Sequence, residues 1–137
     1  MLNYKPFPFS IARSRQTWDN LIQKYGTLAL LRQPVMADRW ISAMAAGGSA
    51  SERLGMVANP LDHVLLISAL SPETGEELDL DPSEKDVVVI LATNDDGSPV
   101  LDSVGKPQEY GLLKIVAPPE PAGPNNTPLY WRLQVRA

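Results

Sequence analysis

The chain has 137 residues, of which 44% are hydrophobic and 20% charged, which fits one globular domain rather than a disordered chain. It has no cysteine and a single histidine, so disulfide frameworks, thiolate zinc sites and histidine-rich metal sites are excluded. The longest apolar run covers only residues 87–92, whereas a transmembrane helix needs about 20 apolar residues, and residues 1–6 lack a signal-peptide pattern.

The net charge of −4 is distributed unevenly along the sequence. Residues 1–57 hold seven basic and three acidic residues, and residues 58–109 hold two basic and twelve acidic residues. Residues 110–137 are basic again, with three basic residues and one acidic residue. A net acidic chain does not wrap DNA by counterion release. Two interpretations stay open: copies stack a basic face on an acidic face, or the acidic residues lie in solvated loops.

The first predicted element is a helix over residues 11–25. Residues 1–9 precede it and are expected to form an extended arm, because their two prolines disfavour helical backbone. Ser10 is a suitable N-cap and Gly26 a suitable C-terminal stop. Apolar residues recur between them at helical spacing, so the helix is expected to be amphipathic. The apolar positions are Ile11, Trp18, Leu21, Ile22 and Tyr25.

Strand patterns follow the helix as far as residue 136. The aliphatic runs at 63–70 and 86–92 are typical of strands that are covered on both faces. Residues 129–136 alternate strictly between apolar and polar side chains, which predicts a half-buried antiparallel strand. Further strands are expected at 27–33, 39–46, 54–57 and 110–116.

The connections between these strands are long and polar. Residues 71–85, here called the acidic segment, hold six carboxylates, and residues 93–108 contain an Asn-Asp-Asp-Gly turn signal. Residues 117–128 contain five prolines and are expected to form a stiff excursion. One helix followed by six or so strands predicts a single, mainly β domain over 1–137. Residues 27–136 would form a small barrel or sandwich, with the helix packed outside it.

Patterns for catalysis and metal binding are weak in this sequence. It has no phosphate-binding glycine loop and no Gly-x-Ser-x-Gly elbow. Asp62 would point to the opposite face of a strand from its neighbour His63, so we interpret His63 as a structural residue. The spacing of Asp79 and Asp81 matches no calcium loop. We therefore expect no enzyme activity, no cofactor and no bound metal.

The order of sequence patterns along the chain resembles that of a known family. The helix ends in Lys-Tyr-Gly at 24–26, a Leu-Leu-Arg strand follows at 30–32, and a Trp-containing strand lies at 39–43. An Asp-x-Val-Leu-Leu-Ile-Ser-Ala strand spans 62–69, and a proline-rich loop precedes Leu-Tyr-Trp-Arg-Leu-Gln-Val-Arg at 129–136. In this order they resemble the head-closure, or stopper, proteins in the neck of tailed bacteriophages and phage-derived particles.

The resemblance implies a ring-forming β-barrel protein, SH3-like or sandwich-like, without enzymatic activity. Such a protein is made in the cytoplasm of a bacterial host and sits in the neck of the virion. Its partners would be further copies of itself, the portal or adaptor protein, and the tail terminator or tail tube protein. It would retain packaged double-stranded DNA without sequence-specific binding or membrane contact, and would dock the tail. The acidic segment and residues 93–108 have no counterpart in the family pattern.

Two alternatives to this function stay open. One is an adjacent neck or tail-terminator ring component, and the other is a small β-barrel module that binds a sugar or a peptide. In a ring, we expect the acidic segment to face either the DNA channel or a basic face of a neighbouring ring, unless it is only a solvated loop. The candidate carboxylates are Glu73, Glu76, Glu77, Asp79, Asp81 and Glu84, and the candidate cations are Arg13, Arg15 and Arg53.

Overall fold

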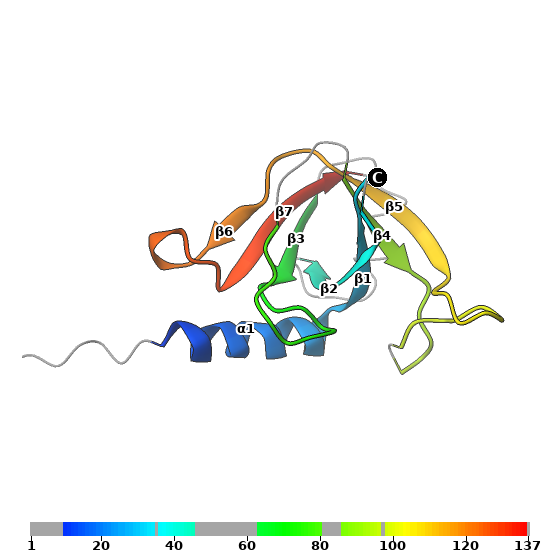
Figure 1. Ribbon diagram of the computed structural model, residues 1–137, viewed down its shortest axis with the longest axis horizontal. Coiled ribbons are helices and arrows are strands. Elements are labelled where there is room, and N and C mark those ends of the chain that lie inside the picture. Colours follow the sequence, from blue (N-terminus) through cyan, green and yellow to red (C-terminus); the bar gives the residue numbers. More distant parts are fainter. Residues whose placement is uncertain (1–9, 35, 46–62, 81–85, 97, 137) are drawn as a thin grey trace, which may run out of the picture.

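The computed structural model describes residues 10–34, 36–45, 63–80, 86–96 and 98–136, which form one α-helix and seven strands (Figure 1). In chain order the elements are α1 (Ile11–Tyr25), β1 (Thr27–Arg32), β2 (Arg39–Ala45), β3 (His63–Ser68), β4 (Val87–Leu91), β5 (Glu109–Ile115), β6 (Glu120–Ala122), the 3-10 turn η1 (Pro124–Asn126) and β7 (Tyr130–Arg136). These elements lie where the sequence predicts them, except for β6. The strand expected at 54–57 lies outside the described residues.

The strands close into an antiparallel barrel. Hydrogen-bonded neighbours follow the order β3-β2-β1-β4-β5-β7, and β3 pairs with β7 to complete the circle. β6 adds a short extra strand to β7. The expected mainly β fold with one N-terminal helix is therefore confirmed, in the form of a closed six-stranded barrel.

Alternate residues of the strands fill the interior of the barrel. They form one buried cluster, which extends from Ala29 and Leu31 on β1 to Leu133 and Val135 on β7. The burial along β7 alternates residue by residue, as its sequence predicts. The interior is thus a packed apolar core.

A second, smaller cluster of apolar residues lies on the outer face of the barrel. Leu30, Val89 and Leu91 are buried there, and Trp40 packs against them. The register places Trp40 opposite Leu30 and Leu30 opposite Val89, so this cluster crosses three neighbouring strands. Both faces of β4 are therefore covered, which explains its continuous aliphatic sequence.

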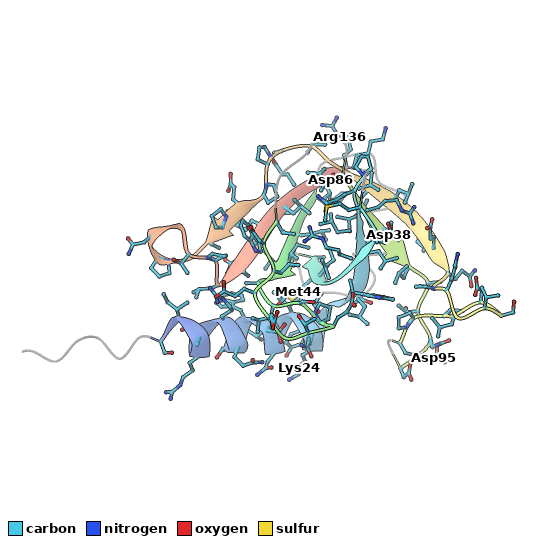
Figure 2. The ribbon with its side chains drawn as sticks, in the orientation of Figure 1. Lys24, Asp38, Met44, Asp86, Asp95 and Arg136 are labelled. Atoms are coloured by element: carbon cyan, nitrogen blue, oxygen red, sulfur yellow. The ribbon has the colours of Figure 1, made fainter. Side chains whose placement is uncertain are left out.

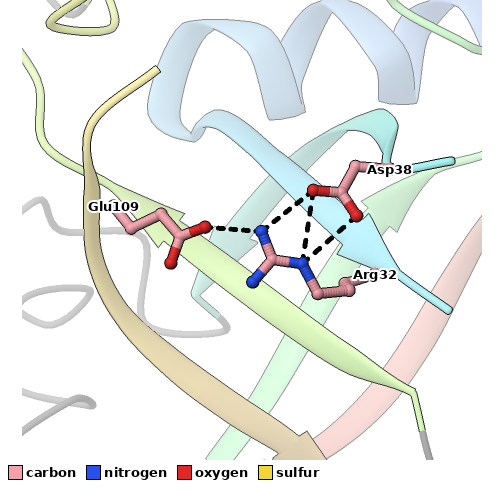
Figure 3. Close-up of polar contacts among 3 residues, drawn as sticks. All are labelled: Arg32, Asp38 and Glu109. Atoms are coloured by element: carbon pink, nitrogen blue, oxygen red, sulfur yellow. Dashed lines mark hydrogen bonds and ion pairs between the residues drawn. The ribbon is translucent and has the colours of Figure 1, made fainter. Parts of the chain in front are cut away.

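An ion-pair network joins the two strands that flank β4 (Figure 3). The Arg32 guanidinium at the end of β1 lies 2.9 Å from the Asp38 carboxylate and 2.5 Å from the Glu109 carboxylate at the start of β5. The hydrogen bonds to Asp38 and then to Glu109 raise the pKa of Arg32, so it stays charged. Because all three side chains are partly exposed, we expect the network to set the orientation of the strands more than their stability.

The helix begins and ends where local chemistry favours it. The Ser10 hydroxyl accepts a hydrogen bond from the Arg13 N–H at 3.2 Å, which caps the N-terminus. At the other end, the Gly26 N–H donates to the Ile22 carbonyl at 2.7 Å. A Cβ atom at Gly26 would lie only 2.2 Å from the Ala43 carbonyl oxygen. Glycine is therefore needed where the chain passes from α1 into β1 beside β2.

The face of α1 that packs on the barrel is more polar than its sequence pattern predicts. Ile22 is fully buried, and Trp18 is half-buried against Tyr130 with the ring centroids 4.3 Å apart. Arg15 and Asp19 are also buried on this face. The remaining apolar positions are exposed, namely Ile11, Leu21 and Tyr25. Tertiary hydrogen bonds, described below, decide which polar side chains are buried.

Residues 117–128 contain β6, a strand that the sequence did not predict. The five prolines of this segment indicated a stiff excursion without pairing. Pro121 nevertheless lies in β6, opposite Trp131 of β7. Among the described strands, β6 has β7 as its only neighbour in the sheet. An edge strand tolerates a proline because one side of its backbone needs no donor.

The described residues between β4 and β5 are hydrogen-bonded to one another rather than forming an open loop. The Ala92 N–H donates to the Gln108 carbonyl at 2.9 Å, and the Val100 N–H donates to the Ala92 carbonyl at 2.9 Å. Further along, the Asp102 N–H donates to the Lys106 carbonyl at 2.8 Å. The segment therefore extends the β4–β5 end of the barrel as a folded projection (Figure 1).

Replacing Ile22 with alanine should lower the free energy of unfolding by about 2–5 kcal/mol, because the change leaves a cavity at a fully buried position. The matched control is Leu21→Ala, at an adjacent position that is 38% exposed, and it should cost less than about 1 kcal/mol. Urea denaturation followed by circular dichroism measures both variants. Equal losses would contradict the packing of α1 described here.

Candidate interaction surface

The described part of the acidic segment, residues 71–80, is anchored to the barrel core. Leu78 and Leu80 are buried in the main cluster, whereas Glu77 and Asp79 between and beside them are exposed. The Leu78 N–H donates to the Ala69 carbonyl at 2.7 Å, and its carbonyl accepts a hydrogen bond from the Trp131 indole at 3.1 Å. This alternation displays the carboxylates outward from a fixed backbone.

A tight turn precedes this anchored part. The Ser71 N–H donates to the Glu76 carbonyl and the Gly75 N–H to the Ser71 carbonyl, both at 2.8 Å. Gly75 has a φ of 73°, a left-handed conformation that favours glycine. The Glu73 carboxylate accepts a hydrogen bond of 3.4 Å from the Trp40 N–H on β2. The turn is therefore held against the barrel at both ends.

Arg15 joins α1 to the acidic segment within one chain. Its Nη1 lies 2.6 Å from Oε1 of Glu77, and its Nε donates to the Pro128 carbonyl at 3.0 Å. The Arg15 side chain is only 9% exposed, whereas that of Glu77 is 77% exposed. Arg15 is thus engaged inside its own chain, and it is not placed to meet the carboxylates of a neighbouring copy.

Asp19 joins α1 to the barrel at a second point. One oxygen of this buried carboxylate accepts a hydrogen bond of 2.5 Å from the Ser68 hydroxyl at the end of β3. The other oxygen accepts one of 2.7 Å from the Gln23 side-chain amide on the next turn of the helix. A buried carboxylate needs such donors, because its desolvation is costly without them.

Four of the six candidate carboxylates are described, and all four are exposed along the acidic segment: Glu73, Glu76, Glu77 and Asp79. Arg13 is exposed on α1. Asp81, Glu84 and Arg53 lie outside the described residues. Among the described candidates, the structure brings together only Arg15 and Glu77.

The sequence analysis missed a group of cations on the outer face of β5 and β7. Lys114, Arg132 and Arg136, here called the basic stripe, are all exposed. The register places Lys114 directly opposite Arg136, although like charges in that position are unfavourable. The alternation of β7 already put Arg132 and Arg136 on one side. The pairing that adds Lys114 joins strands that are far apart in sequence, so the sequence pattern did not reveal it.

The Arg136 end of the basic stripe and the acidic segment lie toward different ends of the molecule. In the shared orientation of Figures 1 and 2, Arg136 lies at the top, whereas residues 70–80, in green, pass α1 at the bottom. The barrel between them is the packed core described above. These two groups of opposite charge therefore lie on separate parts of the surface.

Comparison with protein-family models, with curated proteins and with solved structures finds no match for this chain. In the described ranges, no three His, Asp or Glu side chains gather closely enough to hold a metal ion. The one α-helix of the described part of the chain is too short and too polar to cross a membrane. The two charged surfaces are thus the features on which a function can be argued.

Replacing Arg15 with methionine should lower the free energy of unfolding by about 1–3 kcal/mol, because the Pro128 carbonyl then loses its buried donor. The matched change on the partner, Glu77→Gln, should cost less than about 1 kcal/mol, since that side chain is mostly exposed. Urea denaturation measures both variants. A larger loss from Glu77→Gln would show that the ion pair, rather than the bond to Pro128, holds α1 in place.

Proposed function

We propose that this protein is a structural, non-enzymatic ring component of the head-closure type in the neck of a tailed bacteriophage or phage-derived particle. Its copies assemble between the portal or adaptor protein and the tail terminator or tail tube protein. The ring retains packaged double-stranded DNA and presents the surface on which the tail docks. The sequence pattern that resembles the head-closure family supports this proposal, and a closed barrel with one N-terminal helix is compatible with it.

The observation that carries the proposal is the separation of two opposite charges on one rigid barrel. Leu78 and Leu80 fix the acidic segment to the core, and the basic stripe lies on paired strands of the same barrel. Contact between the acidic segment of one copy and the basic stripe of the next uses a different surface on each partner. Such heterologous contacts generate rings when the rotation between copies closes. Charge complementarity also steers the encounter and sets the orientation.

The exposed carboxylates also suit a wall near DNA. Every phosphate that a protein neutralises adds affinity, and a channel lined with many cations would hold DNA fast. Those carboxylates of the acidic segment that do not contact the next copy would face the channel and repel the phosphates instead. A ring with carboxylates on its channel wall retains DNA by enclosing it rather than by binding it. The DNA therefore stays free to move when the tail opens.

Electron microscopy and light scattering of the purified protein test this proposal. The expected result is a ring with a central hole, whose mass corresponds to several copies of the chain. The ring should weaken as salt increases, because screening reduces the contact between the two charged surfaces. A protein that stays monomeric at all concentrations would contradict the proposal and favour the sugar- or peptide-binding module.

Removing two exposed charges from the acidic segment, with Glu76→Gln and Asp79→Asn together, should weaken the ring and reduce its dependence on salt. The matched control changes two exposed aspartates of the β4–β5 projection, Asp95→Asn and Asp102→Asn, and should assemble like the wild type. Analytical ultracentrifugation at several salt concentrations compares the two. Equal behaviour of both variants would show that the acidic segment does not join the copies.

A further inference from the structure

Most of β5 has a neighbouring strand on only one side. β4 pairs with it from Lys114 to Glu109, whereas β7 pairs only with Lys114 and Ile115. Among the described strands, none pairs with residues 109–113 on the side away from β4. These five residues are here called the β5 edge. Such an edge is a template for another strand, because backbone donors and acceptors lie open along it.

The hydrogen bonds at the end of β5 show which backbone groups face the open side. The Val116 N–H donates to the Gln134 carbonyl of β7 at 3.0 Å. The Ile115 N–H points the other way and donates to the Asp86 carbonyl, next to β4, at 3.4 Å. Because successive residues of an antiparallel strand direct their backbone groups to opposite sides, those of Leu112 face away from β4.

A β-bulge changes this alternation near the start of β5. The β4–β5 register skips Tyr110, which is therefore an extra residue on β5. The Gln108 carbonyl accepts a hydrogen bond of 2.9 Å from the Ala92 N–H on the β4 side, so the backbone groups of the next residue, Glu109, face the open side. The open groups of Glu109 and Leu112 thus lie three residues apart, whereas a regular strand would space them by two.

The side chains of this edge carry a simple pattern on the outer face of the barrel. Glu109 lies opposite Leu91 and Leu112 lies opposite Val89, and both of these partners belong to the outer apolar cluster. Leu112 is 47% exposed. Lys114, two residues further along the same face, is also exposed. The edge therefore presents an acidic, an apolar and a basic side chain in succession.

We propose that the β5 edges of two copies pair with each other in an antiparallel arrangement. The two-fold axis passes between Tyr110 and Gly111, so each Glu109 lies opposite Leu112 of the other copy. Each of these two pairs exchanges two backbone hydrogen bonds. The spacing of three residues matches because both copies have the same bulge. A regular strand would be out of step with it, so the bulge favours a second copy over other extended chains.

The charges of the edge are complementary in this arrangement. Lys114 lies two residues beyond Leu112, and is therefore the diagonal neighbour of Glu109 on the other copy, within reach of a long side chain. The contact occurs twice, once on each side of the axis. Lys114 also lies opposite Arg136 in its own chain, and a carboxylate of the second copy would offset the repulsion between these two cations.

A two-fold contact uses the same surface on both copies, so it produces a dimer and adds no further copies. It differs in this respect from the heterologous contact proposed for the ring, and it does not depend on that contact. Lys114 belongs to the basic stripe as well as to the β5 edge. The dimer is therefore the expected state of chains that have not joined a ring.

Two substitutions of Leu112 test the pairing, in chains that also carry Glu76→Gln and Asp79→Asn to weaken the ring contact. Leu112→Glu places a second carboxylate opposite Glu109 of the other copy and should weaken the dimer by about tenfold or more. Leu112→Lys removes the same apolar side chain but pairs with Glu109, and should leave the dimer within about threefold of the unchanged edge. Analytical ultracentrifugation measures dimerisation, and circular dichroism checks that both variants keep the barrel. Equal weakening by both substitutions would overturn the inference.

Disulfide trapping tests the register, because the wild-type chain contains no cysteine. Copies carrying Glu109→Cys are mixed with copies carrying Leu112→Cys under mild oxidation. The mixed disulfide should form about tenfold faster than either symmetrical one, because opposite residues lie about 5 Å apart, whereas two copies of one position are offset by about 10 Å along the strands. Mixed and symmetrical disulfides in random proportion would overturn the proposed pairing.

Light scattering of the wild type, run alongside, separates this inference from the proposed function. Rings formed by a protein whose cross-links are random would overturn the β5 pairing and leave the ring in place. Register-specific cross-links in a protein that forms only dimers would support the β5 pairing and overturn the ring. A monomer with random cross-links would overturn both.

Discussion

The barrel depends on the pairing of β3 with β7, because this contact closes the sheet. It runs over six residue pairs, from His63 opposite Val135 to Ser68 opposite Tyr130, and no other strand pairing among the described residues joins the two ends of the strand order. Without it, β3 and β7 would be open edges with unpaired backbone groups, and the core would face water. The helix is placed at one end of this pairing. Asp19 bonds to Ser68, and Trp18 packs on Tyr130, so α1 contacts both members of the terminal pair.

The position of the acidic segment follows from the same contact. The segment leaves β3 directly and returns along it, since the Leu78 N–H bonds to the Ala69 carbonyl. Trp131 of β7 bonds to the Leu78 carbonyl, and Arg15 of α1 bonds to Glu77. Three elements thus hold a segment whose composition indicates a solvated loop. The carboxylates of residues 71–80 are displayed at fixed positions. Fixed positions favour recognition by a partner, because a mobile loop would lose entropy on binding.

The sequence predicted those parts of the fold that depend on local signals. Ser10 and Gly26 mark the ends of α1, and apolar periodicity locates six of the seven strands. β6 was missed because its prolines indicated a segment without pairing, although β7 lies close in sequence. The other failures share one physical cause, which is that the partner lies far away in the chain. Asp19 is buried because the Ser68 hydroxyl donates a hydrogen bond to it, and Arg15 is buried because the Pro128 carbonyl accepts one from it. The periodicity of the helix sequence predicts neither contact. For the candidate surface, the composition located the carboxylates, but the basic stripe depends on the β5–β7 register.

The exposed charges of this surface are informative because folding alone does not require them. Lys114, Arg132 and Arg136 are exposed on the outer face of β5 and β7, where their charges add nothing to the apolar core. Carboxylates of another molecule would meet three cations there on two neighbouring strands. A closed barrel leaves few free strand edges for such contacts, so apart from the β5 edge the recognition surfaces of this molecule lie on its side chains and on the segments that project from the barrel.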